Sequence, residues 1–312
     1  MDLLKKTAKD IKSITIQGAT KIAEAAIKAL EHVAKTSKAK TKSQMILELE
    51  KAKILLYATR PTEPLMRNSL RFIVANAKES KFEDIDDLRK LVSVAGKDIL
   101  NKIYAAKKRI GEFAGNKIEE GMTVFTHCHS STVIDAFRHA KSQGKKFSVI
   151  CTESRPLFQG RTTAKELIEI GIPVTMIIDS NVSAHIKKAD MVMVGADLIT
   201  SDMNFVNKVG TQNVAYGAKR VGVPLYVCTD LAKYDPETMF GKTEEIEQRS
   251  PDEVWKGAPK KLKIVNPAFD VVPRELATAY ITQEGVLAPE SMLDVINEKY
   301  TWITYGASPK SI

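Results

Sequence analysis

Disulfide frameworks and membrane-spanning segments are both missing from this sequence. Its three cysteines, Cys128, Cys151 and Cys228, are odd in number and far apart, and each lies at or near the end of a strand-like run, which predicts reduced thiols. No apolar run approaches the roughly 20 residues needed to span a bilayer, and the N-terminus lacks the apolar core of a signal peptide. We therefore expect a cytoplasmic protein that does not contact a membrane.

A concentrated block of positive charge is also missing, although the chain carries a net charge of +9. Its lysines are scattered along helical patterns and are not interleaved with aromatic residues, which make up only 6% of the sequence. This distribution indicates a solvated basic surface, and we expect no nucleic-acid partner. A phosphorylated small molecule is compatible with such a surface.

The first third of the chain does have a helical periodicity. Ala, Lys, Ile and Leu recur there every three or four residues, which predicts helices at 19–34, 43–58, 64–77 and 82–114. From about residue 116, short apolar runs alternate with helical stretches, a pattern typical of a mainly parallel sheet covered by helices. We interpret the 312 residues as two domains of an α/β protein, an all-helical N-terminal domain (1–115) and a Rossmann-like, doubly wound domain (116–312).

Strands are predicted in the second domain at 122–127, 147–152, 173–178, 191–195, 223–229, 263–266 and 279–283. The helical stretches that connect them are 131–142, 161–170, 181–188 and 211–221. A Pro-, Gly- and Lys-rich loop occupies 250–262, and a closing helix begins near 289. We expect the strand order 3-2-1-4-5, in which the first and fourth strands are neighbours and the order reverses between them.

Cys128 and Asp197 follow the first and the fourth of these strands. Ligands of doubly wound sheets bind outside the carboxyl ends of the strands where the order reverses, so this topology would bring the two residues to one site. A thiol and a carboxylate placed there are suited to proton transfer. The alternatives are that Cys128 is a small buried hydrophobic residue and that Asp197 only caps a helix or a turn.

Groups suited to phosphate follow Cys128. Ser130, Ser131 and Thr132 begin a helix, whose N-terminus attracts anions and is expected to lower the Cys128 pKa. Further candidate contacts, each also compatible with an ordinary turn or surface position, are Gln17, Gly18, Ala19, Thr20, Arg60, Gln159, Asn207, Lys208 and Lys233. His127 and His129 have no second Cys/His pair at ligand spacing, so we expect no metal site.

Five sets of motifs, in the same order along the chain, resemble those of the archaeal ribose-1,5-bisphosphate isomerases. They are Thr-His-Cys-His-Ser (126–130), Glu-Ser-Arg-Pro with the following Gln-Gly-Arg and Thr-Ala-Lys-Glu-Leu (153–167), Gly-Ala-Asp (195–197), Asn-Lys-Val-Gly-Thr (207–211) and Asn-Pro-Ala-Phe-Asp (266–270). That family belongs to a superfamily with methylthioribose-1-phosphate isomerase and the alpha, beta and delta subunits of translation initiation factor 2B. The resemblance covers essentially the whole chain.

The resemblance implies that Cys128 and Asp197 are the catalytic pair. It implies substrate-binding roles for Arg60, Ser130, Ser131, Thr132, Gln159, Asn207, Lys208 and Lys233. One departure concerns Gln17 and Thr20, because the family usually has Arg-Gly-Ala-Gly where this chain has Gln-Gly-Ala-Thr (17–20). Loss of that arginine would remove a cation beside a phosphate and cost roughly 1.5 to 3 kcal/mol of binding.

The implied reaction converts ribose 1,5-bisphosphate to ribulose 1,5-bisphosphate in nucleoside monophosphate salvage, without a metal or redox cofactor. The family also implies a homohexamer built from dimers and activation by AMP. The alternatives are a non-catalytic regulatory subunit like those of initiation factor 2B, which would bind a nucleotide or sugar phosphate, and methylthioribose-1-phosphate isomerase. Retention of both Cys128 and Asp197 favours an enzyme, and the cationic residues available for a second phosphate favour the bisphosphate.

Overall fold

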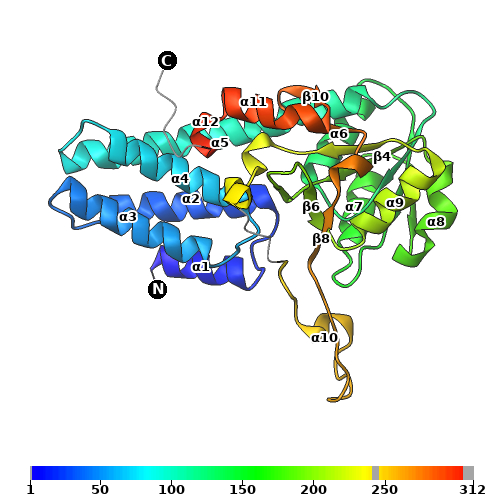
Figure 1. Ribbon diagram of the computed structural model, residues 1–312, viewed down its shortest axis with the longest axis horizontal. Helices are drawn as coiled ribbons and strands as arrows, with labels where there is room; N and C mark the ends of the chain where they lie inside the picture. Colours follow the sequence, from blue (N-terminus) through cyan, green and yellow to red (C-terminus); the bar gives the residue numbers. More distant parts are fainter. Residues whose placement is uncertain (1, 241–245, 305–312) are drawn as a thin grey trace.

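Five helices fill the N-terminal part of the computed structural model, which describes residues 2–240 and 246–304 (Figure 1). They are α1 (Leu3–Lys12), α2 (Ala19–Thr36), α3 (Lys42–Tyr57), α4 (Pro64–Glu79) and α5 (Ile85–Asn116). Apolar side chains spaced three or four residues apart bury one face of each helix, as Ile22, Ala26 and Leu30 do in α2. The four helices predicted between residues 19 and 114 are confirmed, each to within three residues at either end.

A seven-stranded sheet forms the second part, with the strand order β10-β9-β7-β4-β1-β2-β3. Its strands are β1 (Thr123–Thr126), β2 (Ser148–Thr152), β3 (Val174–Ile177), β4 (Met191–Gly195), β7 (Leu225–Cys228), β9 (Ala279–Thr282) and β10 (Gly285–Leu287). Neighbouring strands pair in parallel, except for β10 on β9. The predicted order 3-2-1-4-5 is confirmed, because β1 lies between β2 and β4, and the fifth predicted strand, β7, follows β4.

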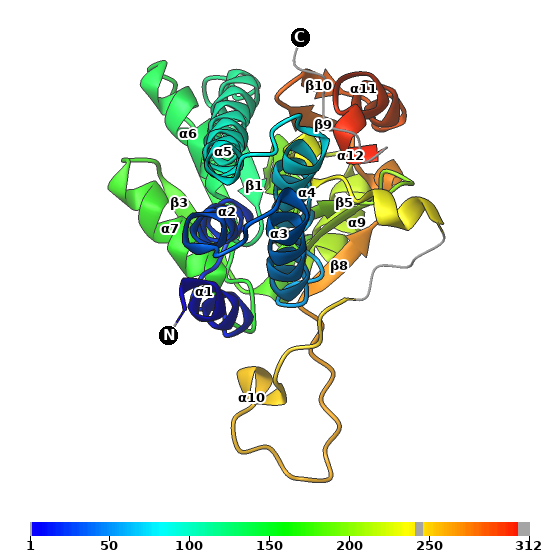
Figure 2. The same cartoon turned by 90° about the vertical axis from the view of Figure 1, so that its left-hand side faces the viewer.

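Helices cover both faces of this sheet (Figures 1 and 2). Val124 of β1 packs in a cluster with α5, α6 (Ser131–Ser142) and α7 (Gln159–Glu169). Phe125, the next residue, belongs to a second cluster that includes α8 (Val182–His185) and α9 (Thr211–Val221). Successive side chains of a strand point to opposite faces, which explains why consecutive residues in the middle of the central strands are apolar.

A second, antiparallel sheet of three strands was not predicted. It consists of β5 (Leu198–Ile199), β6 (Phe205–Lys208) and β8 (Phe269–Val272), which pair in the order β5-β6-β8. The strand predicted at 263–266 is wrong, because this run lies in an arm that projects from the body beyond α10 (Pro251–Val254), where Val265 is 66% exposed (Figure 1). The apolar run that pairs is β8, a few residues later.

Of the remaining predicted helices, α6 and α9 have the predicted ends, and the others are confirmed with changed ends. The helix predicted at 181–188 is the short α8 flanked by the 3-10 turns Asp179–Asn181 and Ile186–Lys188. The closing helix α11 (Met292–Lys299) follows a 3-10 turn at Pro289–Ser291, and α12 (Thr301–Thr304) comes after it. Within the described ranges, no helix combines the length and the apolarity that crossing a membrane requires. The domain boundary at residue 115 stays a prediction.

Candidate active site

A cavity of about 420 Å³ opens where the carboxyl ends of β1, β2 and β4 face the N-terminal helices. Its volume is typical of a small-molecule site. All of the candidate residues from the sequence line it, namely Gln17, Gly18, Ala19, Thr20, Arg60, Cys128, Ser130, Ser131, Thr132, Gln159, Asp197, Asn207, Lys208 and Lys233. The fold therefore brings them together, while their individual roles stay predictions.

Cys128 lies in a strained turn directly after β1. Its φ angle is +67°, in the left-handed region that residues other than glycine rarely adopt. The Cys128 amide donates to Ser154 Oγ at 2.8 Å, and the Thr163 hydroxyl donates to the Cys128 carbonyl oxygen at 2.8 Å. Burial raises the pKa of the thiol to about 11, and the positive charge of Lys208 opposes this only in part. The expected lowering of the Cys128 pKa is therefore wrong, because desolvation outweighs the neighbouring positive charge.

Asp197 lies two residues beyond Gly195, the last residue of β4. Its amide donates to the Val206 carbonyl oxygen of β6 at 2.8 Å, which fixes the chain as it leaves the sheet. Gly195 permits a close approach to the turn after β1, because an added Cβ would lie 2.7 Å from Ser130 Oγ. The glycine thus allows the strand end that carries Asp197 to pack against the turn that carries Cys128.

Two helix N-termini face the cavity. The α6 helix begins after Ser130, whose hydroxyl accepts a hydrogen bond from the Val133 amide at 3.4 Å, and Ser131 and Thr132 lie in its first turn. The α2 helix begins after Gly18, which has a φ angle of +86° and offers no side chain to cap the helix amides. Unpaired amides and the partial positive charge of a helix N-terminus attract anions. Both ends are therefore suited to phosphate groups.

Lysine side chains enter the cavity from β6 and from the turn after β7. Lys233 ends the 3-10 helix Leu231–Lys233, and its ammonium donates to the Ala196 carbonyl oxygen at 2.6 Å. Lys208 ends β6, and its ammonium lies 5.1 Å from the centre of the Phe269 ring. Among the residues that the structure describes, neither ammonium has a carboxylate within ion-pair distance. Both charges are available to a ligand.

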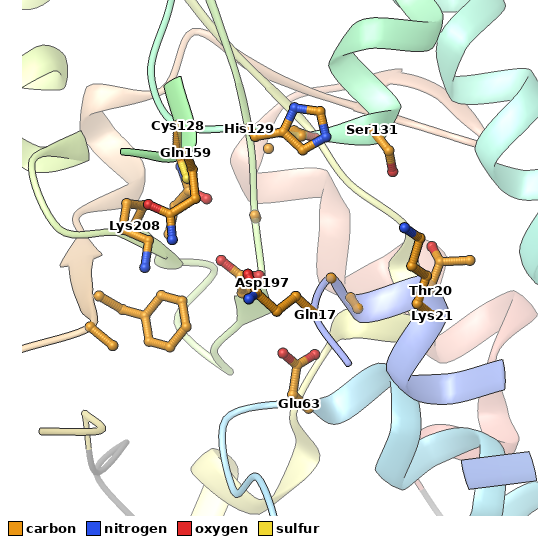
Figure 3. A pocket seen from close by; sticks show the side chains of 18 of the residues that line it. Gln17, Thr20, Lys21, Glu63, Cys128, His129, Ser131, Gln159, Asp197 and Lys208 are labelled. Carbon is orange, nitrogen blue, oxygen red and sulfur yellow. The ribbon is translucent and has the colours of Figure 1, made fainter. Parts of the chain in front are cut away.

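Polar atoms without partners occur at the cavity wall. Gln159 Oε1, at the start of α7, and Glu63 Oε2, just before α4, are buried and have no hydrogen-bond partner among the described residues. Such groups are rare in folded proteins, and each costs about 1 to 3 kcal/mol unless water or a ligand satisfies it. Both side chains are among those that surround the pocket in Figure 3. These unpaired atoms indicate a site that is completed by a bound molecule.

Four charged residues of the cavity, Glu63, Lys21, Glu166 and Arg249, were not predicted as site residues from the sequence. Lys21 lies in the first turn of the predicted helix 19–34, directly after the candidate residues 17–20, and this proximity was the available signal. Glu63 stands three residues after Arg60 and carried no signal beyond that proximity. Arg249 reaches the cavity only through the tertiary fold.

The two histidines beside Cys128 have different positions. His127 is buried, with Nδ1 2.6 Å from Thr152 Oγ1 and Nε2 3.0 Å from the Val209 carbonyl oxygen, so it ties the ends of β1, β2 and β6 together. His129 lines the cavity. Burial lowers the pKa of both imidazoles, which favours their neutral form. Among the described residues, no group of three His, Cys, Asp or Glu side chains is arranged to hold a metal ion.

The chain belongs to the initiation factor 2 subunit family, whose model matches residues 15–289. Among its curated relatives, it is 39% identical over 305 residues to the ribose 1,5-bisphosphate isomerase of Pyrococcus furiosus, covering 95% of this chain and 93% of that protein. It is 36% identical to the ribose 1,5-bisphosphate isomerase of Methanocaldococcus jannaschii, covering 97% of each chain. A methylthioribose-1-phosphate isomerase of Desulforamulus reducens is 34% identical, with 90% of this chain and 86% of that protein covered.

Solved structures with this architecture include two proteins of Pyrococcus horikoshii. The chain superimposes on a translation initiation factor eIF-2B with a TM-score of 0.80 and 26% identity, covering 92% of this chain and 97% of the other. It superimposes on 5-methylthioribose 1-phosphate isomerase with a TM-score of 0.76 and 28% identity, covering 95% and 87%. The helical region followed by a mostly parallel sheet is thus the fold of this family.

Proposed function

We propose that this protein is a sugar-phosphate isomerase that converts ribose 1,5-bisphosphate to ribulose 1,5-bisphosphate. One observation carries the proposal: a thiol and a carboxylate, Cys128 and Asp197, follow neighbouring strands and line one cavity with two helix N-termini and the ammonium groups of Lys208 and Lys233. The similarity to the ribose 1,5-bisphosphate isomerases of Pyrococcus furiosus and Methanocaldococcus jannaschii, at 39% and 36% identity, supports the same reaction. Nucleoside monophosphate salvage is the pathway that the family resemblance implies.

The reaction requires one proton donor and one proton acceptor. Ring opening adds a proton to the ring oxygen as the bond from C1 to that oxygen breaks. Hydrogen then moves from C2 to C1, and the C2 hydroxyl loses its proton as it becomes the ketone, so one proton is gained and one is lost. Cys128 and Asp197 are the groups that we assign to this exchange.

The two phosphates would bind where positive charge and free amides gather. The N-termini of α2 and α6, together with Lys208 and Lys233, surround the cavity, and their separate positions suit a ligand with an anionic group at each end. This distribution favours the bisphosphate over a sugar with one phosphate. We also propose, following the family resemblance, that the protein forms a homohexamer built from dimers and that AMP activates it.

The assay that tests the function incubates the purified protein with ribose 1,5-bisphosphate, with and without AMP, and measures ribulose 1,5-bisphosphate by chromatography. We expect turnover by the unaltered protein and at least a hundredfold loss, about 3 kcal/mol in the barrier, in Cys128→Ser and in Asp197→Asn. Cys228→Ser, a buried thiol outside the cavity, is the matched control and should keep its activity.

Full activity in both active-site variants would refute the assigned pair. The absence of turnover by the unaltered protein would favour the second candidate, a non-catalytic regulatory subunit. That candidate is supported by the similarity to the solved eIF-2B of Pyrococcus horikoshii.

A further inference from the structure

Glu63 is a buried acid at the cavity wall whose side chain makes no close ion pair with a described residue. It immediately precedes α4, yet its carboxylate makes no capping hydrogen bond to the helix amides. Its side chain is only 2% exposed, and Oε2 has no hydrogen-bond partner within residues 2–240 and 246–304. The carboxylate lines the cavity and is drawn among the side chains that surround it in Figure 3. A buried acid that neither caps its helix nor forms a close ion pair costs stability.

The charges around Glu63 do not neutralise it. Arg60 Nε lies 3.9 Å from Glu63 Oε1, beyond hydrogen-bond distance, and 3.5 Å from Glu247 Oε2, so one guanidinium is shared between two carboxylates. Lys233 is the other cation that acts on Glu63, whereas Asp197 and Glu247 oppose its negative charge. Burial first, and the Asp197 charge second, raise the pKa of Glu63 to about 7. Glu63 is therefore able to donate as well as accept a hydrogen bond near neutral pH.

This environment selects an uncharged polar partner. A phosphate placed against Glu63 would meet the negative charge of Asp197 as well, which is unfavourable in a buried site. A hydroxyl both donates and accepts, so it satisfies a carboxylate and a carboxylic acid equally well. Ribose 1,5-bisphosphate has two free hydroxyls in its ring form, at C2 and C3. The wall formed by Glu63 and Asp197 therefore suits the sugar, and the lysines and helix ends suit its phosphates.

We propose that Glu63 contacts one hydroxyl of the bound sugar beside Asp197 and makes the site reject sugars that lack that hydroxyl. The assignment rests on the proposed function and adds a specificity-determining residue to it. A ligand without the hydroxyl would leave the buried carboxyl unpaired again. Sites that hydrogen-bond a ligand hydroxyl discriminate strongly against the analogue without it for this reason.

The test compares dissociation constants, measured by titration calorimetry, for ribose 1,5-bisphosphate and for its 2-deoxy and 3-deoxy analogues. We expect the unaltered protein to bind one of the two analogues at least about tenfold more weakly than the parent sugar. In Glu63→Met the ratio of the analogue's dissociation constant to that of the parent sugar should fall to about twofold, because no buried polar group is left unpaired when the hydroxyl is absent. Glu63→Gln keeps a donor and an acceptor, and should retain most of the discrimination.

Glu247→Gln is the matched control, because Glu247 shares Arg60 with Glu63 but does not line the cavity. The ratio of dissociation constants in Glu247→Gln should equal that of the unaltered protein.

Equal affinity of the unaltered protein for all three sugars overturns the proposal without reference to any variant. If Glu63→Met binds all three sugars more weakly by the same factor, the ratio of dissociation constants is unchanged, and the proposal is overturned in favour of a structural role for Glu63. Turnover of ribose 1,5-bisphosphate by the unaltered protein would still support the proposed function in that case. Failure of the unaltered protein to bind any of the three sugars defeats the proposed function itself, and this assignment with it.

Discussion

At Cys128, burial and a neighbouring lysine act on the thiol in opposite directions. Burial raises its pKa to about 11, and the Lys208 charge lowers the pKa without reversing the shift. The Cys128 sulfur therefore carries its proton at neutral pH. A helix N-terminus after a cysteine is a frequent reason for an acidic thiol, but a sequence does not report how much water the fold removes from the sulfur.

Alkylation by iodoacetamide tests this protonation state. Because the thiolate is the reactive form, we expect the rate at Cys128 to be low at pH 7 and to rise about tenfold per pH unit, without a plateau below about pH 10. Lys208→Met should slow the reaction further, since it removes the charge that favours the thiolate. Mass spectrometry of the labelled peptide gives the rate. A plateau between pH 6 and 8 would show instead that the thiol is acidic.

The first turn of α2 contains a cation, Lys21, four residues after the position where the family resemblance implies an arginine. Gln17 donates from its amide to the Ile14 carbonyl oxygen at 3.0 Å and has no charge to offer a phosphate. Lys21 lies four residues later, in the first turn of α2, and lines the same cavity. We propose that Lys21 replaces the arginine that the family resemblance implies at the position of Gln17.

Substitution of Lys21 tests this replacement. We expect Lys21→Met to weaken binding of ribose 1,5-bisphosphate about tenfold, measured by titration calorimetry, with a smaller loss at high salt. Adding Gln17→Arg to this variant should restore most of the affinity. Lys28→Met is the control, because Lys28 lies on the same helix in an exposed pair with Glu24 and does not line the cavity. Unchanged affinity in Lys21→Met would contradict the interpretation.

The elements that the sequence predicted well are those with many buried apolar residues in a regular pattern. The helix α9 coincides with the predicted 211–221, and the central strands were found because both faces of each are buried. The small sheet escaped prediction because β5 has two residues and β6 carries Asn207 and Lys208 at its end. Glu63 was not predicted as a site residue because a glutamate before a helix, without a capping role, has no distinctive sequence pattern. Only the tertiary fold shows that its carboxylate is buried.

Across the whole molecule, buried polar contacts join the helical region to the sheet. Arg67 Nη2 of α4 lies 2.6 Å from Asp235 Oδ2, and both side chains are almost fully buried. The Asn68 amide donates to the carbonyl oxygens of Ala232 and Tyr234 at 2.8 Å each. These two carbonyls flank Lys233, so α4 fixes the turn that brings this lysine into the cavity.

Equilibrium unfolding in urea tests the coupling of the two regions. We expect far-ultraviolet circular dichroism and tryptophan fluorescence to report one common transition, because Trp302 packs on Phe72 of α4 while the dichroism follows all helices. Arg67→Met should lower the free energy of unfolding by about 3 to 5 kcal/mol, since it leaves Asp235 buried without its cation. Lys90→Met, which removes an exposed pair on α5, should change it little. Two separate transitions in the unaltered protein would show that the regions unfold independently.

The cavity has one wall from α2 and the residues before α4, and the other from the strand ends. A ligand held by Lys21 and Lys208 at once would therefore act as a removable cross-link between two parts of the chain that are distant in sequence. A free ligand concentration of one hundred times the dissociation constant adds about 2.7 kcal/mol to the stability of the folded state. The supply of substrate would then set the lifetime of the protein against proteolysis as well as the rate at which it works.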